Sequence, residues 1–175
     1  MQIALRFPFP KRLQPYHSNE FAFLERRLTP RSVFMDIGSP DCKLALQAAS
    51  YVERVYAIDV SGRFLQSGLI PLNLRLVLCG GVRIPVPEAS VDVAFSGGFI
   101  DQLPADDAQE HFKSVLRALA AGGAYLCKTS FPQQSRSAML AAGFGAAACY
   151  AGAVRIPAAL VSLVPQRLLR IVGVR

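Results

Sequence analysis

The sequence predicts an α/β fold, with a mostly parallel sheet that is covered by helices on both faces. Its 175 residues are the length of one domain, and 52% of them are hydrophobic against 18% charged, which is enough to bury a core. Five short apolar segments are separated by helical segments or loops, a pattern typical of buried parallel strands. Aspartate, glycine and serine gather where these segments end, and ligands of such sheets bind at those ends.

Residues 1–31 are predicted to form an arm followed by one helix. Three prolines among the first 15 residues favour an extended chain in the arm. Apolar residues at helical spacing predict a helix over residues 21–28, and Pro30 is expected to end the helical region.

Residues 32–130 hold the predicted core. Its strands are expected at residues 32–38, 54–59, 74–78, 91–96 and 124–128. A short helix is expected over residues 43–52. An amphipathic helix is expected from about residue 106 to 119, and the pair Gly122-Gly123 is expected to end it.

Residues 131–175 are expected to form the C-terminal edge of the sheet. Residues 135–142 have a helical pattern, and strands are expected within residues 145–157 and 167–174. The apolar stretch over residues 151–164 fits packing in the core or at the sheet edge, and its alternative is a contact surface in a homodimer.

Cysteine and histidine are too few and too scattered for a metal site or a disulfide framework. The four cysteines lie far apart without a C-x-x-C pair, and the chain has two histidines. No apolar run reaches the roughly 18 residues that span a bilayer, and the N-terminus lacks the pattern of a signal peptide. These features predict a cytoplasmic protein without a metal or a membrane partner.

Positive charge gathers at both ends of the chain, whose net charge is +7. The first 35 residues carry an excess of four basic side chains, residues 36–130 an excess of two acidic ones, and residues 131–175 five basic side chains and no acidic one. Nucleic acid or a phosphorylated substrate is one interpretation, and an arginine-rich composition is the other. Because no run of like charge exceeds two residues, we expect a partner other than nucleic acid.

Carboxylates stand at the ends of the first two predicted strands, as Asp36 and Asp59. After Asp36, Gly38 lets the chain turn tightly and lets a ligand approach the backbone. A carboxylate at position 59 can accept hydrogen bonds from both hydroxyls of a ribose, and its alternative role is to cap the next helix. The chain lacks both G-x-G-x-x-G and G-x-x-x-x-G-K-[ST], so neither a dinucleotide nor P-loop phosphate chemistry is expected.

Five segments carry a family pattern when they are taken in order. They are residues 35–38 (MDIG), 56–61 (YAIDVS), 84–96 (IPVPEASVDVAFS), 99–103 (FIDQL) and 115–126 (VLRALAAGGAYL). In this order and at this spacing the chain resembles the class I S-adenosylmethionine-dependent methyltransferases, as a small, type 11-like member. The resemblance covers residues 32–127 and continues more weakly to residue 144.

The resemblance implies a Rossmann-like domain with an antiparallel edge strand near the C-terminus. It implies methyl transfer from S-adenosylmethionine to an acceptor, by in-line displacement that depends mainly on positioning. The residues implied to bind the cofactor are Asp36, Gly38, Ser39, Pro40, Asp59, Val60, Gly80, Gly81, Ser96 and Gly97. The first four would lie near the methionine part, Asp59 at the ribose, Val60 and the two adjacent glycines at the adenine, and the last two near the sulfonium.

The chain departs from the family pattern in its glycine turn and after its third strand. Pro40 and Cys42 stand where the family has its second and third glycines, and Gly80 stands where members often have an acid. A catalytically inactive methyltransferase-like module that binds a partner is therefore the alternative to an enzyme.

No catalytic residue is predicted, because an activated methyl donor needs a general base only for an acceptor that keeps its proton at neutral pH. Asp101 and His111 are the nearest candidates, with solvated or structural roles as their alternatives. Tyr16 and His17 of the N-terminal arm could fold over the site. A small molecule is the expected acceptor.

Overall fold

The computed structural model describes residues 19–61, 70–165 and 168–175, so the predicted arm with Tyr16 and His17 lies outside the described residues. Five strands and three helices precede the C-terminal part: α1 (Asn19–Glu25), β1 (Val33–Ile37), α2 (Lys43–Ala49), β2 (Arg54–Asp59), β3 (Leu74–Leu78), β4 (Val91–Gly97), α3 (Ala105–Ala118) and β5 (Leu119–Lys128). The C-terminal part contains α4 (Pro132–Ala141), β6 (Ala146–Ala151), β7 (Val154–Ile156) and β8 (Leu169–Val174). Two 3-10 helices are also present, η2 (Ile100–Gln102) and η3 (Ala158–Leu163).

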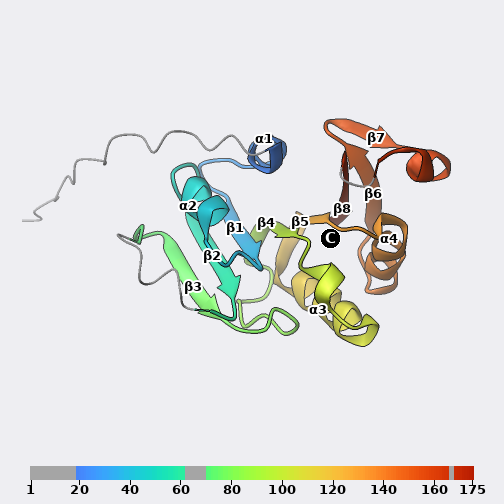
Figure 1. Cartoon of the computed structure of the whole chain (residues 1–175). Coiled ribbons are helices and arrows are strands. Elements are labelled where there is room, and N and C mark those ends of the chain that lie inside the picture. Colours follow the sequence, from blue (N-terminus) through green and yellow to red (C-terminus); the bar gives the residue numbers. More distant parts are fainter. Residues whose placement is uncertain (1–18, 62–69, 166–167) are drawn as a thin grey trace, which may run out of the picture.

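The strands form one sheet in the order β3-β2-β1-β4-β5-β8-β6-β7. Strands β1 to β5 are parallel, and β8, β6 and β7 continue the sheet in antiparallel pairs. Figure 1 shows β3 at one end of the sheet and these C-terminal strands at the other. The order reverses at β1, which lies between β2 and β4, and such a reversal opens a ligand crevice beyond the carboxyl ends of the strands. This architecture confirms the predicted Rossmann-like fold with its antiparallel C-terminal strands.

Two apolar clusters pack on opposite faces of the sheet. One includes Phe34, Phe95 and Leu126 with the buried side chains of α1 and α2. The other includes Met35 and Tyr125 with the buried side chains of α3 and α4. Successive strand residues alternate between the clusters because side chains of a strand point to opposite faces in turn.

The junction of α3 and β5 differs from the prediction. The helix ends at Ala118, and β5 begins at Leu119, so Gly122 and Gly123 lie inside the strand and do not end the helix. A Cβ atom on Gly123 would lie 2.9 Å from the carbonyl oxygen of Ala120, and the pairing of β4 with β5 shifts register near this point. The two glycines therefore serve an irregular bend in a strand.

The C-terminal tail contains a hairpin where one strand was expected. Strands β6 and β7 pair with each other and turn near Gly152, which has φ +57°. Strand β8 inserts between β5 and β6, so the last strand in sequence is not the edge of the sheet. Part of the predicted apolar stretch becomes η3, from which Leu160 and Leu163 remain exposed.

Candidate functional site

The turn after β1 lies beside the end of β2. The backbone N–H of Gly38 donates a hydrogen bond of 2.9 Å to the carbonyl of Ile58, and Gly38 has φ +72°. A Cβ atom at this position would come within 2.9 Å of the Phe99 ring. Gly38 is therefore required both by the backbone conformation and by the close approach of Phe99.

A cavity of about 240 Å³ opens at this turn. Five predicted cofactor residues line it together: Asp36, Gly38, Ser39, Pro40 and Gly97. Cys42 is buried and turned away into the core, where its thiol donates to the carbonyl of Ser39 at 3.3 Å. Thus, of the two residues that replace glycines of the family turn, Pro40 lines the cavity and the Cys42 side chain leaves it open.

Asp36 is a buried carboxyl group with one oxygen that lacks a protein partner. Its side chain is 2% exposed, and within the described residues Oδ2 has no hydrogen-bond partner. Burial raises the pKa of Asp36 to about 7, although hydrogen bonds from the Ser39 side chain and the Ala45 backbone act in the opposite direction. An unsatisfied oxygen in a cavity wall is suited to bind a positively charged or hydrogen-bonding group of a ligand.

Asp59 lies on the same face of the sheet as Asp36. Asp36 pairs in register with Ala57, two residues before Asp59, and paired strand residues point to the same side. Oδ1 of Asp59 accepts a 2.8 Å hydrogen bond from the backbone of Ser61, and the side chain is 9% exposed. Val60 follows as an exposed side chain. The Gly38 turn is therefore hydrogen-bonded to the residue before Asp59, and the two carboxylates share a face of the sheet, although Asp59 is not among the residues that line the cavity at the turn.

Phe99 fills the space between the Gly38 turn and the loop after β3. A Cβ atom on Gly81, which also has a positive φ of +72°, would come within 2.5 Å of the ring. Gly80 is exposed, and a Cβ atom there would meet open space. Of the two predicted glycines, Gly80 therefore faces solvent and Gly81 packs on Phe99.

Ser96 does not direct its hydroxyl toward the cavity. Its side chain is fully buried and lies 2.6 Å from the Tyr125 hydroxyl, which is 2.9 Å from Nε2 of His111. Nδ1 of His111 is 2.6 Å from the carbonyl oxygen of Gly81. That oxygen can only accept, so Nδ1 donates, Nε2 accepts from Tyr125, and Tyr125 accepts from Ser96.

This buried chain of hydrogen bonds is structural. Burial lowers the pKa of His111 to about 4, so the imidazole is neutral at pH 7. The position of Ser96 follows from strand alternation: it pairs with Ile37 and Cys127, whose side chains lie in the cluster beneath α3. Because the Ser96 side chain is buried in this cluster, only its backbone could contact a ligand.

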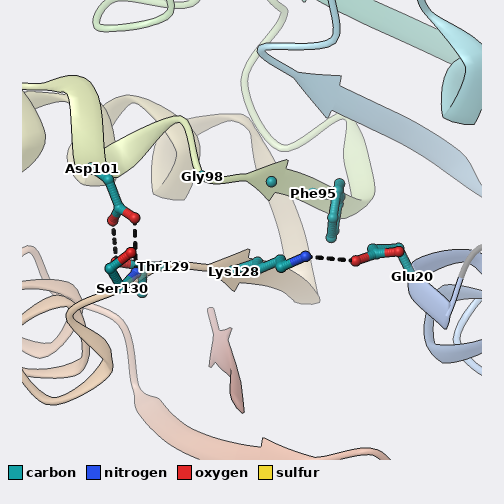
Figure 2. A pocket seen from close by; sticks show the side chains of 8 residues that line it. Glu20, Phe95, Gly98, Asp101, Lys128, Thr129 and Ser130 are labelled. Carbon is teal, nitrogen blue, oxygen red and sulfur yellow. Dashed lines mark hydrogen bonds and ion pairs between the residues drawn. The ribbon is translucent and has the colours of Figure 1, made fainter. Parts of the chain in front are cut away.

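A second cavity, of about 600 Å³, adjoins the first. Glu20, Phe95 and Gly97 line both cavities. Figure 2 shows the Lys128 side chain reaching toward Glu20. The ammonium lies 2.9 Å from Oε1 of the carboxylate.

On another wall of the second cavity, Asp101 holds the start of the segment after β5. Its Oδ1 accepts from the Thr129 hydroxyl, and its Oδ2 accepts from the backbone N–H of Ser130 at 2.8 Å (Figure 2). Both oxygens are therefore engaged, and the carboxylate acts as a support for the cavity wall.

The sequence analysis missed Glu20, Lys128 and Phe99 as site residues. Lys128 is the last residue of β5, so the rule that sites form at the carboxyl ends of parallel strands could have identified it. Glu20 is separated from Lys128 by 108 residues, and no local pattern predicts that they meet.

The described part of the chain offers neither a metal centre nor a membrane span. It contains no group of three or more His, Cys, Asp or Glu side chains placed to hold a metal ion. None of its helices is long and apolar enough to cross a bilayer. The two adjoining cavities are lined by carboxylates, a lysine and exposed backbone.

Comparisons with known proteins identify the family of the chain. The family model described as "Methyltransferase domain" matches residues 35–127, more than half of the chain. No curated protein sequence matches the chain at a significant level.

Solved structures resemble the chain in fold at low sequence identity. A chain in the complex between the Haloferax volcanii Trm112 methyltransferase activator and a methyltransferase is 18% identical with a TM-score of 0.67, covering 91% of this chain and 89% of that one. An S-adenosylmethionine-dependent methyltransferase from Mesorhizobium loti is 14% identical with a TM-score of 0.67, covering 91% of this chain and 99% of that one.

A third similar structure is larger. Haemonchus contortus phosphoethanolamine N-methyltransferase 2, in complex with phosphomonomethylethanolamine and S-adenosylhomocysteine, is 18% identical with a TM-score of 0.65. The match covers 78% of this chain and 39% of that one. On the family match and this fold, the chain belongs to the methyltransferase domain family and is a member of the class I S-adenosylmethionine-dependent methyltransferase superfamily.

Proposed function

We propose that the chain transfers a methyl group from S-adenosylmethionine to a small-molecule acceptor, with the cofactor in the crevice at Asp36 and Asp59 and the acceptor in the larger cavity. The observation that carries the proposal is Asp36, which lines the smaller cavity and whose buried Oδ2 has no hydrogen-bond partner among the described residues. A buried polar atom without a partner is rare in proteins and is suited to a ligand group. The residues present therefore fit the cofactor that the family uses.

Each part of the crevice has a proposed binding role. Asp36 would bind the amino group of the methionine part, whose positive charge favours an ionised carboxylate. Asp59, already fixed by Ser61, would accept hydrogen bonds from the ribose hydroxyls. Backbone at Gly38 and Gly97 would allow close approach, because neither residue carries a side chain into the cavity.

When bound, S-adenosylmethionine supplies a methyl group that is already activated for displacement. The task left to the protein is to hold the acceptor in line with it, and positioning of this kind contributes about 7–11 kcal/mol in favourable cases. The shared lining of the two cavities by Phe95 and Gly97 puts their junction at the end of β4. Asp101 would support the acceptor cavity through Thr129 and Ser130, since both of its oxygens are engaged there.

The size of the larger cavity supports a small-molecule acceptor. Its volume of about 600 Å³ falls within the range of about 300–1,000 Å³ typical of small-ligand sites. Among the similar structures, the Haemonchus contortus enzyme holds a small phosphorylated amine. The Haloferax volcanii structure instead contains a protein activator, and a protein partner or a second copy of this chain is the alternative way to complete the cavity of this chain.

The test is calorimetric titration of the full chain with S-adenosylmethionine at pH 8. We expect binding in the wild type, and Asp59→Ala should weaken it by about 1–3 kcal/mol through loss of hydrogen bonds to the ribose. Asp106→Ala, on the exposed first turn of α3, is the control and should bind like the wild type. A folded wild-type chain that gives no heat at millimolar cofactor would support the inactive binding module instead.

A further inference from the structure

Glu20 stands at the junction of the two cavities. Its carboxylate lines both the smaller cavity at the Gly38 turn and the larger cavity beside Lys128. Under the proposed function, a methyl group passes from one cavity to the other at this junction. The Glu20 carboxylate therefore occupies space that an acceptor needs.

Two cations hold this single carboxylate. Nζ of Lys128 lies 2.9 Å from Oε1 of Glu20, and Nη2 of Arg170 lies 3.3 Å from the same oxygen. The Lys128 side chain is 40% exposed, whereas that of Arg170 is 10% exposed. Both cations meet this carboxylate in a partly buried place, where charges interact more strongly than in water.

The carboxylate is not what attaches α1 to the sheet. Phe21, Phe23 and Leu24 of this helix are buried in the cluster on that face. Burial of these three apolar side chains holds the helix on the sheet independently of its carboxylate. The helix can therefore stay in place when its Glu20 side chain turns away from the cations.

Lys128 is placed to reach an acceptor. It ends β5 in register with Gly97, one of the residues that line both cavities. The carbonyl of Lys128 accepts a 2.9 Å hydrogen bond from Gly98, so the backbone under the ammonium is fixed to the end of β4. Figure 2 shows the Lys128 side chain lying along the cavity between Phe95 and the Thr129 segment.

Building on the proposed function, we infer that Lys128, with the less exposed Arg170 behind the same carboxylate, forms a subsite for an anionic group of the acceptor, a carboxylate or a phosphate. Glu20 fills this subsite in the free protein, and the acceptor anion displaces it. The acceptor is thus a small molecule with an acidic group at one end and the methyl-accepting atom at the other.

The competition between Glu20 and the acceptor anion gives the inference its test. Inorganic phosphate and acetate are titrated separately into the full chain, and the backbone amide resonances of Gly98 and Thr129 are followed by NMR. We expect saturable shifts, with binding at least five-fold tighter in Glu20→Gln and lost in Lys128→Met. Lys128→Arg should retain binding because it keeps the charge. Lys113→Met, on the exposed face of α3, is the matched control and should bind like the wild type.

The two anions separate the two kinds of acceptor. Tighter binding of phosphate assigns a phosphorylated acceptor, and tighter binding of acetate assigns a carboxylic acid. Equal affinity in the wild type and Glu20→Gln, or binding retained in Lys128→Met, overturns the inference. Should Glu20→Gln disturb α1, the comparison of Lys128→Met with Lys128→Arg still decides the result.

The same samples distinguish this inference from the proposed function. Binding of S-adenosylhomocysteine is measured on each variant by calorimetry, and the Lys128 and Lys113 variants are expected to retain it. Cofactor binding without the anion response overturns the subsite alone. The anion response without cofactor binding overturns the proposed function and leaves the subsite in place.

Discussion

Replacing Asp36 by asparagine tests the physical state of the most buried carboxyl group in the site. Burial raises the pKa of Asp36 from an ordinary value of 3.8 to about 7, so the folded protein holds a proton there that the unfolded chain has already released. Between these two pH values the folded state binds more protons than the unfolded state, and its stability therefore falls as pH rises. Asparagine has nearly the same shape and carries no charge at any pH.

The magnitude follows from the difference between the two pKa values. A difference of 1 between the folded and unfolded pKa values corresponds to about 1.4 kcal/mol. Ionisation of Asp36 therefore destabilises the folded protein without ligand by about 4 kcal/mol once pH exceeds 7. We expect Asp36→Asn to match the wild type in free energy of unfolding near pH 4. At pH 8 the variant should be more stable than the wild type by about 4 kcal/mol.

Urea unfolding followed by circular dichroism at several pH values from 4 to 8 measures this difference. Asp106→Asn, on the exposed first turn of α3, is the control and should stay within about 0.5 kcal/mol of the wild type. The His111 contribution to pH dependence is common to wild type and variant and cancels in their difference. If the difference in free energy of unfolding between Asp36→Asn and the wild type is the same at pH 4 and pH 8, the reasoning that burial keeps Asp36 protonated is refuted.

Three further predictions concern the same crevice. Calorimetry should show that wild-type affinity for S-adenosylmethionine rises from pH 6 to pH 8 as Asp36 ionises, and that Asp36→Asn removes this rise. Thermal unfolding should show that Gly81→Ala is destabilised by about 2–5 kcal/mol. Alanine is strained at a positive φ, and the cost of the clash of its Cβ atom with Phe99 adds to that strain. Gly98 has a similar φ of +77°, but a Cβ atom there would meet open space, so Gly98→Ala should lose about 1–2 kcal/mol of stability. Equal losses of stability in the two variants would contradict the Phe99 contact. Burial lowers the pKa of His111 from 6.5 to about 4, so the free energy of unfolding of the wild type relative to His111→Gln should fall by about 3 kcal/mol as pH drops between these values, because the opposite contribution of Asp36 is common to both proteins and cancels. A difference measured by urea unfolding that stays constant over this range would contradict the prediction.

The ends of the parallel strands could be predicted because burial on both faces gives apolar runs that stop at polar residues. Asp36 and Asp59 follow directly from such runs, and the structure puts both on one face of the sheet, in neighbouring strands. The direction of Ser96 was missed, although its cause is local. Side chains alternate along β4, so Phe95 faces the cavity and Ser96 faces the core beneath α3.

Other features depend on contacts that no local pattern records. The glycine pair at 122–123 has the composition of a helix end, but crowding against Ala120 in β5 explains it. The ion pair of Glu20 with Lys128 joins residues 108 positions apart. Phe99 is one of many aromatic residues in the sequence, and only the fold brings it between two glycine turns.

The most direct test of the account is a crystal structure of the full chain with S-adenosylhomocysteine. We predict that the ribose hydroxyls lie within hydrogen-bond distance of the Asp59 carboxylate and that the amino group contacts Oδ2 of Asp36. A nucleoside bound at another place, or a crevice between the Gly38 turn and Asp59 that stays closed by protein side chains, would contradict the account.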